Sequence, residues 1–302
     1  MLNLPSKATS PTMYFIGVTT GQSSIMRIFP IWAKALGIDA CIKGIDIALH
    51  APAENYRAAV EFIKNDPLSL GALVTTHKID LYNACKDLFE YFDPYAQQFG
   101  EISSISKRDG KLCGHAKDPI SVGLALDAFL PAEHWKKYPK AQACVLGAGG
   151  SALAVSAYLQ HEKHGGNVPA RINLNNRSVP RLAEAIHLLE SSRVPMSFHL
   201  CPQPEWNDLI VEALPEGSIV INATGMGKDR PGSPLTDNCV FPMHGIVWEF
   251  NYRGTLEFMH QAEAQKETRD LLIEDGWTQV IAEVFHIDIT GERLALCDRL
   301  AR

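Results

Sequence analysis

A glycine-rich segment at residues 145–152, with the sequence VLGAGGSA, has the spacing of a nucleotide-binding turn. An apolar run stops at Gly147, and an alanine-rich helical pattern starts at Ser151. Gly147 permits a tight turn, Gly149 lets a ligand approach the backbone, and Ala152 is small enough for close helix–strand packing. The free N–H groups of the helix N-terminus attract a pyrophosphate. We therefore expect a dinucleotide site that uses Gly147, Gly149, Gly150 and Ser151, with an ordinary glycine-rich turn as the alternative.

The end of the next expected strand, residues 171–175, favours NADP over NAD. It is followed by Asn176, Arg177 and Ser178, and Arg181 comes one helical turn later. An NAD site usually has an acid at this place, which would repel the 2′-phosphate of NADP, whereas a guanidinium binds that phosphate in a bidentate manner. Solvated arginines are the alternative, but arginine at a helix N-terminus opposes the helix dipole unless an anion is bound there.

Lys78 and Asp118 are the candidates for proton transfer. Each follows an expected strand, and the carboxyl ends of strands in open α/β sheets are where ligands bind. A lysine beside a carboxylate can exchange a proton with a substrate hydroxyl, and the carboxylate orients the ammonium. Two other interpretations remain open at this point: Lys78 as a surface lysine at a helix start, and Asp118 as an N-cap.

The order of expected elements places these residues in an α/β protein with two domains and a cleft between them. Helices between strands imply right-handed crossovers and mostly parallel sheets. Strands are expected at residues 13–20, 40–48, 70–75, 142–146, 171–175, 218–223 and 245–250, and a hairpin at 102–107 and 111–116. Helices are expected at residues 24–36, 54–65, 78–88 and 118–129, with a linker at 130–140 and a largely helical C-terminus from residue 255.

Composition excludes several classes of protein. The chain has 302 residues, 46% of them hydrophobic and 21% charged, and a formal charge of −6, which does not suggest a nucleic-acid partner. No apolar run approaches the roughly 20 residues that span a bilayer, and no signal peptide is apparent. Seven scattered cysteines without a C-x-x-C pair indicate reduced thiols in a cytoplasmic protein, and the histidines lack metal-ligand spacing, so no metal is expected.

Taken in order, these motifs resemble those of the shikimate dehydrogenase family, in a divergent shikimate dehydrogenase-like or quinate-shikimate dehydrogenase branch. Its V-L-G-A-G-G-x-A and N-R-T-x-x-R motifs are matched closely at residues 145–152 and 176–181. Further counterparts of family motifs occur at residues 17–26, 77–78, 100–104, 112–118 and 221–227, and at Tyr252. The resemblance therefore covers almost the whole chain.

The resemblance implies an NADP-dependent oxidoreductase that interconverts a ring hydroxyl and a ketone of shikimate or a related cyclic hydroxy acid. Such an enzyme acts in shikimate metabolism and aromatic amino acid biosynthesis. It implies a substrate domain of residues 1–122 with 277–302, a Rossmann domain of residues 123–276, and a monomer or homodimer without a membrane partner. The catalytic residues it implies are Lys78 and Asp118; the substrate-binding residues are Ser23, Thr75, Ser103, Tyr252 and Glu283; Thr224 and Gly227 lie near the nicotinamide half of the cofactor.

The departures from the family pattern lie on the substrate side. Ile25 replaces a serine, Ser103 and Ala116 replace asparagines, and Lys117 replaces a threonine. Glu283 stands where the family has a substrate-binding glutamine, and it is either a specificity residue or a solvated acid. Because a pocket built from hydrogen-bonding groups discriminates strongly, these changes should weaken shikimate binding. The alternatives are an NADP-binding regulatory protein with little or no catalysis, and a dehydrogenase of another substrate class.

Overall fold

The computed structural model describes residues 2–227, 230–251, 254–276 and 291–301. The chain divides into two compact units, Met1–Lys117 with Gln279–Arg302, and Asp118–Thr278. The first unit therefore contains both ends of the sequence, and its C-terminal helix returns to it after the second unit is complete. The domain boundaries expected at residues 122 and 277 stay a prediction.

The first unit is built on a six-stranded sheet in the order β2-β1-β3-β5-β6-β4. Strands β1, β2 and β3 pair in parallel, and β5 runs antiparallel to both β3 and β6. The chain leaves β1 for β2 on one side and then returns to β3 on the other, so the strand order reverses at β1. The strands are β1 (Thr12–Gly17), β2 (Cys41–Asp46), β3 (Ser69–Val74), β4 (Tyr91–Phe92), β5 (Ser104–Arg108) and β6 (Lys111–His115).

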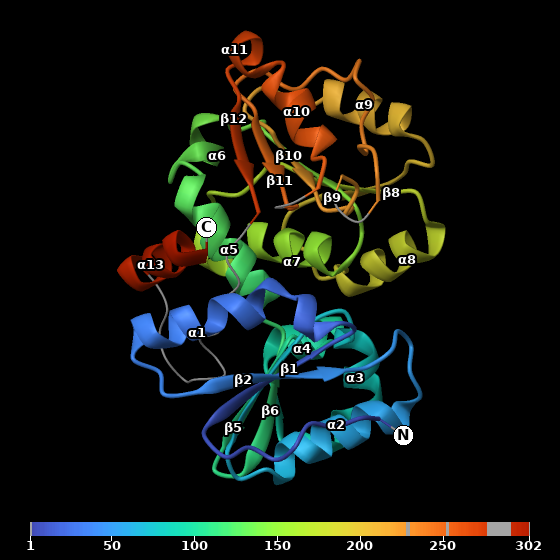
Figure 1. Cartoon of the computed structure of the whole chain (residues 1–302). Coiled ribbons are helices and arrows are strands. Elements are labelled where there is room, and N and C mark those ends of the chain that lie inside the picture. Colours follow the sequence, from blue (N-terminus) through green and yellow to red (C-terminus); the bar gives the residue numbers. More distant parts are fainter. Residues whose placement is uncertain (1, 228–229, 252–253, 277–290, 302) are drawn as a thin grey trace. The chain divides into compact units, whose positions relative to one another are not determined.

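Helices cover both faces of this sheet (Figure 1). Alternate residues of β1 face opposite ways: Tyr14 packs in the core that includes α2, and Met13 packs in the core that includes α1. On α1, Trp32 donates a hydrogen bond of 2.8 Å from Nε1 to the carbonyl oxygen of Cys297, which ties the C-terminal helix to this unit. The helices are α1 (Ser24–Leu36), α2 (Ala53–Asn65), α3 (Lys78–Cys85), α4 (Pro94–Phe99) and α13 (Gly291–Ala301), with 3₁₀ turns at Thr20–Gln22 and Lys86–Leu88.

The second unit has a six-stranded sheet, parallel throughout, in the order β12-β11-β10-β7-β8-β9. From β7 the chain proceeds to β8 and β9 on one side, then crosses to β10, β11 and β12 on the other. This is the doubly wound Rossmann order, whose switch point lies between β7 and β10. The strands are β7 (Ala143–Leu146), β8 (Ile172–Asn176), β9 (Met196–Leu200), β10 (Ile219–Asn222), β11 (Ile246–Glu249) and β12 (Leu272–Asp275).

Two hydrophobic cores hold the helices of the second unit on opposite faces of its sheet (Figure 1). Val145 packs in the core that includes α5 and α7, while Cys144 and Leu146 pack in the core that includes α9 and α10. Burial on both faces explains why the central strands β7, β10 and β11 are mostly apolar. The helices are α5 (Asp118–Phe129), α6 (His134–Lys137), α7 (Gly150–Leu159), α8 (Val179–Leu188), α9 (Pro204–Glu212), α10 (Glu257–Glu263) and α11 (Lys266–Arg269), with a 3₁₀ turn at Glu162–His164.

The structure corrects two expectations. The segment Leu272–Asp275 is a strand, not a helix, because it pairs in parallel with β11 and completes the sheet. The expected linker at residues 130–140 belongs to the second unit and contains α6. Trp135 is buried there, and the ring of His134 contacts the carbonyl oxygen of Gly217 at 2.6 Å through Nε2, so this stretch is anchored.

Candidate functional site

The glycine turn lies at the switch point of the Rossmann sheet, between β7 and α7. Gly147 has a φ of +121°, and a Cβ there would lie 2.7 Å from the carbonyl oxygen of Ala223, so only glycine fits without strain. Gly149 has nothing within 4 Å of where its Cβ would stand, which leaves the backbone open to a ligand. Gly150 and Ser151 begin α7 and supply its free N–H groups. These features fit a pyrophosphate.

The end of β8 carries the groups expected to recognise the 2′-phosphate. The side-chain oxygen of Asn176 accepts a 2.8 Å hydrogen bond from the backbone N–H of Ser178, which fixes the turn into α8. Ser178 is the N-cap of that helix, and Arg177 is exposed beside it. Arg181 forms an exposed pair of 2.9 Å with Glu184, so a phosphate would compete with that carboxylate for its guanidinium.

The loop after β10 borders the glycine turn from the neighbouring strand. It contains Thr224, whose hydroxyl donates to the side-chain oxygen of Asn222 at 2.7 Å, and Gly227, which has a φ of +87°. The expected nicotinamide-side residues therefore lie on the same edge of the sheet as the glycine turn. The structure thus brings together, within one unit, the expected cofactor residues from the ends of β7, β8 and β10.

In the first unit the expected substrate residues lie where the strand order of its own sheet reverses. A Cβ at Gly17, at the end of β1, would stand 3.2 Å from the hydroxyl of Thr75, which follows β3. Ser23 ends the loop that follows β1 and is the N-cap residue of α1. The loop and Thr75 thus flank the switch point, which is where open α/β sheets bind ligands.

Lys78 and Ser103 lie at this same edge. Lys78 is the first residue of α3 and is half-buried, and its carbonyl oxygen accepts the N–H of Ile102 at 3.1 Å. The carbonyl oxygen of Ser103 accepts the N–H of Val74 at 2.9 Å, one residue before Thr75. The structure therefore brings Lys78, Thr75 and Ser103 together at the ends of neighbouring segments.

Asp118 opens α5 and is the first residue of the second unit. It is buried and is the first residue of this helix, and its interpretation as an N-cap stays a prediction. The residue before it, Lys117, belongs to the first unit and donates its backbone N–H to the hydroxyl of Ser103 at 2.8 Å. The pairing of Asp118 with Lys78 stays a prediction.

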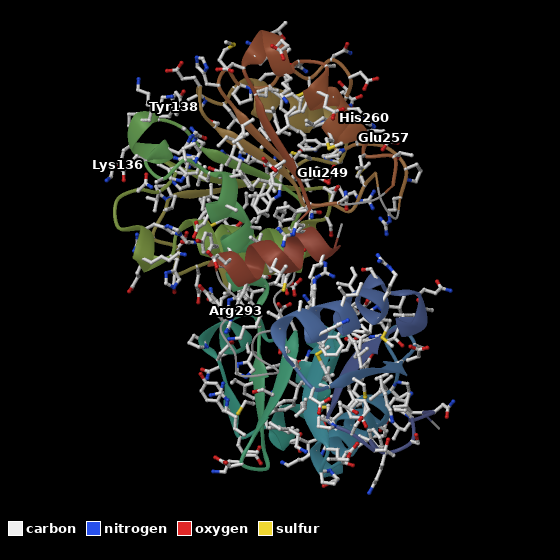
Figure 2. All side chains as sticks on the ribbon, turned by 60° about the vertical axis from the view of Figure 1, so that its left-hand side comes forward. Lys136, Tyr138, Glu249, Glu257, His260 and Arg293 are labelled. Carbon is white, nitrogen blue, oxygen red and sulfur yellow. The ribbon has the colours of Figure 1, made fainter. Side chains whose placement is uncertain are left out.

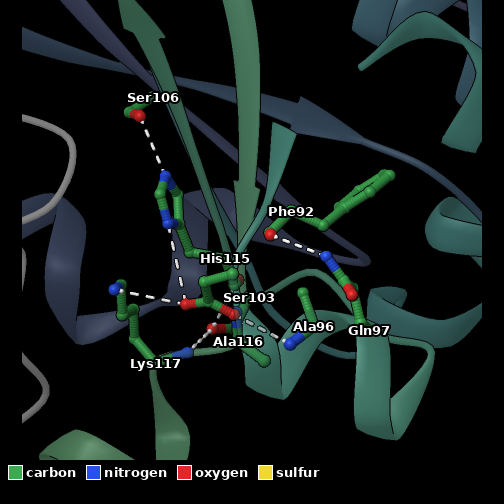
Figure 3. Close-up of polar contacts among 9 residues, drawn as sticks. Phe92, Ala96, Gln97, Ser103, Ser106, His115, Ala116 and Lys117 are labelled. Atoms are coloured by element: carbon green, nitrogen blue, oxygen red, sulfur yellow. Dashed lines mark hydrogen bonds and ion pairs between the residues drawn. The ribbon is translucent and has the colours of Figure 1, made fainter. Parts of the chain in front are cut away.

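A carboxylate that sequence reasoning missed, Asp93, organises the segment before Asp118. Figure 3 shows the polar contacts around His115, Ala116 and Lys117 of this segment. One of its oxygens accepts the N–H of Ala96 at 2.8 Å, as the N-cap of α4, and the N–H of Ala116 at 3.2 Å. The other lies 3.2 Å from Nζ of Lys117 and 3.6 Å from Nδ1 of His115. Asp93 therefore holds three consecutive residues at the end of β6.

Asp93 is kept ionised although it is buried. Burial disfavours the charged form, but contact with His115, the two backbone N–H groups and the charge of Lys117 outweigh burial and lower the pKa of the carboxyl. On the far side of the imidazole, Nε2 of His115 lies 3.0 Å from the hydroxyl of Ser106. The Asp-Pro pair at residues 93–94 signalled a helix start, but nothing local signalled the contacts with residues 115–117.

Two expected substrate residues, Tyr252 and Glu283, lie outside the described residues. Within the described part of the chain, no group of three His, Cys, Asp or Glu side chains could hold a metal ion. All seven cysteines are free. Over the same residues, no helix combines the length and apolarity that crossing a bilayer requires.

Sequence comparison finds curated relatives that are named Shikimate dehydrogenase (NADP(+)). A Shikimate dehydrogenase (NADP(+)) from Symbiobacterium thermophilum is 28% identical over 208 residues, which are 68% of this chain and 65% of that protein. The resemblance to the shikimate dehydrogenase family is confirmed. A protein of the same name from Brucella ovis is 27% identical over 50% of this chain and 48% of its own length. The matched segments thus span less than two thirds of these relatives, and no protein-family model matches the chain.

Comparison with solved structures confirms the expected fold, with its Rossmann unit. The shikimate dehydrogenase from Aquifex aeolicus has a TM-score of 0.71 at 20% identity, and the match covers 100% of both chains. The 5-ketofructose reductase of Gluconobacter sp. strain CHM43 has a TM-score of 0.66 at 19% identity, over 88% of this chain and 87% of that one. Proteins with different substrate names therefore share this fold.

Proposed function

We propose that this chain is an NADP-dependent oxidoreductase of the shikimate dehydrogenase family that interconverts a ring hydroxyl and a ketone of shikimate or a related cyclic hydroxy acid. One observation carries the proposal: the glycine turn lies at the switch point of a Rossmann sheet, with arginines at the end of the adjacent strand. The curated relatives carry the name of this activity and cofactor. The free cysteines support a reducing compartment such as the cytoplasm.

The second unit binds and orients the cofactor in this proposal. Gly147, Gly149, Gly150 and the N-terminus of α7 hold the pyrophosphate, and Arg177 with Arg181 holds the 2′-phosphate. When bound, NADP supplies the hydride chemistry, which no protein side chain provides. Thr224 and Gly227 lie in the loop that borders the nicotinamide half.

Most of the residues proposed to bind the substrate and transfer the proton belong to the first unit, and Asp118 and Tyr252 belong to the second. Ser23, Thr75 and Ser103 orient the hydroxyl groups of the substrate, together with Tyr252 and Glu283. The ammonium of Lys78 gives a proton to the carbonyl oxygen during reduction, or accepts one from the hydroxyl during oxidation through its neutral amine, and Asp118 orients Lys78. The protein's part is thus positioning and proton transfer.

The altered residues of the first unit favour a substrate other than shikimate as a second candidate. Ala116 is fully buried, and it lacks the amide group that an asparagine would present at this position. Lys117 adds a cation that Asp93 balances. Because 5-ketofructose reductase shares this fold, a polyhydroxylated ketone of that kind is the alternative substrate class.

The test follows NADPH absorbance during reaction with shikimate, quinate, aminoshikimate and 5-ketofructose. The Lys78→Ala variant should lose turnover of the active substrate by about 100-fold or more, with unchanged NADPH affinity. The matched control is Lys86→Ala, which removes an exposed lysine from the turn after α3 and should leave turnover unchanged. Wild-type turnover in Lys78→Ala would overturn the role of Lys78, and NADPH binding without turnover of any substrate would favour the regulatory alternative.

A further inference from the structure

A polar network closes the carboxyl ends of β10 and β11, and Glu249 is at its centre. Glu249 is the last residue of β11 and is 0% exposed. Figure 2 shows it inside the second unit, whereas Glu257 and His260 lie toward the outside. One carboxylate oxygen accepts the amide N–H of Asn222 at 2.8 Å, and the other accepts the backbone N–H of Asn251 at 2.9 Å. Both oxygens thus face N–H donors.

The network continues from Asn222 into the loop that borders the glycine turn. The side-chain oxygen of Asn222 accepts the backbone N–H of Thr224 at 3.1 Å and its hydroxyl at 2.7 Å. The carbonyl oxygen of Met226 accepts the amide of Asn251 at 2.8 Å and that of Asn222 at 3.3 Å. The orientation of the Asn222 amide therefore determines the conformation of residues 223–227.

This loop forms part of the dinucleotide cradle. The carbonyl oxygen of Ala223, its first residue, is the group that Gly147 approaches too closely to carry a Cβ. Thr224 and Gly227 are the residues that the proposed function assigns to the nicotinamide side. A change in the Glu249 network should thus change the shape of the cofactor site without touching the cofactor.

We propose that Glu249 is a positioning residue for the cofactor: its carboxylate holds Asn222, and through it residues 223–227, in the conformation that binds NADP(H). This inference rests on the proposed function. A protonated Glu249 presents an O–H to groups that are themselves donors. A proton on the oxygen that faces Asn222 favours turning the amide over, which directs its N–H groups at the backbone N–H of Thr224 and breaks that hydrogen bond.

Proton exchange at Glu249 occurs in the physiological range. Burial raises the pKa of Glu249 to about 7, and the Asp275 carboxylate adds to the rise, although the hydrogen bonds from Asn251 and Asn222 oppose it. Among the described residues, Asp275, at the end of the adjacent strand β12, is the charged group that acts on Glu249. The other groups that face it are the amides of Asn222 and Asn251 and a backbone N–H.

The test measures NADPH affinity by fluorescence titration of the full-length protein from about pH 5.5 to 8.5. For the wild type, affinity should fall about tenfold as Glu249 takes up its proton, because one to two hydrogen bonds of the loop are lost. The 2′-phosphate of NADPH itself titrates near pH 6, so Glu249→Gln, which cannot ionise, provides the baseline. That variant should bind about tenfold more weakly than wild type above pH 8 and lack the titration near pH 7.

Asp275→Asn tests the same link without changing a buried group. Asp275 is exposed, so this variant should fold, and loss of its charge should move the titration of affinity to lower pH. Glu274→Gln, on the same strand, is the matched control and should keep the wild-type profile. A pH profile that neither Glu249→Gln nor Asp275→Asn alters would overturn the role of Glu249 while leaving the proposed function intact. Absence of NADPH binding by the wild type at every pH would overturn both.

Discussion

Asp93 shows how one buried side chain can fix a distant segment of the chain. Its carboxylate joins the N-terminus of α4 to His115, Ala116 and Lys117, and the next residue is Asp118. Removing one partner of a buried charged network leaves the others without compensation, which costs more than the network contributes when whole. A residue outside the proposed chemistry should therefore have a large effect on stability.

The Asp93→Ala variant should lose about 3 kcal/mol of unfolding free energy, because both the cap of α4 and the partner of Lys117 disappear. Asp93→Asn, which can still cap the helix, should lose less. Urea unfolding checks both values. The control is Asp87→Ala, which breaks an exposed pair with Arg57 and should change stability little. Equal losses in Asp93→Ala and Asp87→Ala would contradict the importance of burial.

The sequence predicted those residues whose role depends on their immediate neighbours in the chain. Gly147 was expected from its spacing, and its positive φ and close contact with Ala223 confirm the need for glycine. Asp93 and Glu249 were missed because their partners, Ala116 and Asn222, lie 23 and 27 residues away in sequence. Long-range hydrogen bonds leave no periodic signal, so a buried acid at the end of an apolar run looks like an ordinary strand end.

The two glycines in the turn between β7 and α7 have different roles, one in stability and one in ligand binding. Gly147→Ala should cost about 2 kcal/mol of stability, because a Cβ at positive φ is strained and meets the Ala223 carbonyl. Gly149→Ala has an ordinary φ of −90° and open space, so stability should stay within about 0.5 kcal/mol. Its methyl group should instead weaken NADPH binding by about tenfold, by standing where the phosphate approaches.

Thermal unfolding and NADPH titration of both variants separate the two roles. Loss of stability in Gly149→Ala, or undiminished stability in Gly147→Ala, would contradict this assignment of the turn. The test is independent of substrate identity, because neither measurement requires turnover.

Packing of α5 on α7 supplies a second element-scale prediction. A Cβ at Gly123 would lie 2.0 Å from Cε2 of Tyr158, so the helices approach closely at that point. Gly123→Ala should destabilise the protein by about 1 to 2 kcal/mol, since overpacking exceeds the gain of about 1 kcal/mol from replacing a helical glycine. Urea unfolding measures it, with Gly21→Ala as control because that site has nothing within 4 Å. A more stable Gly123→Ala variant would show that the ring moves aside.

Elements with a strong pattern of their own were predictable, and those that depend on a neighbour were not. The helix expected at residues 24–36 has these bounds in the structure, because its buried stripe and the left-handed Gly37 after it are local signals. Strand β12 was expected as helix, since its four residues form a strand only by pairing with β11. Strands β4 and β9 lie at sheet edges, where sequence patterning is weak.

At the scale of the whole molecule, the ionised form of Glu249 is suited to cofactor binding but opposes folding. A carboxyl whose pKa is higher in the folded than in the unfolded protein binds more protons when folded, so stability falls as pH rises between the two values. For Glu249 the window runs from the ordinary glutamate pKa of 4.5 to about 7. The two units have separate cores, so unfolding need not be a single transition, and the measurement must report on the second unit.

The stability of the second unit should therefore decrease by about 3 kcal/mol between pH 4.5 and 8 through Glu249 alone, at 1.36 kcal/mol for each unit of pKa difference. Glu249→Gln removes this contribution, so the free-energy difference between wild type and variant isolates it from other titrations. Trp248 is fully buried beside Glu249, so the fluorescence of this residue reports on the second unit. The stability of the wild type relative to Glu249→Gln should be lower at pH 8 than at pH 5. A difference that does not vary with pH would mean that Glu249 titrates in the folded protein as it does in the unfolded chain. The carboxylate would then hold Asn222 at no cost to folding.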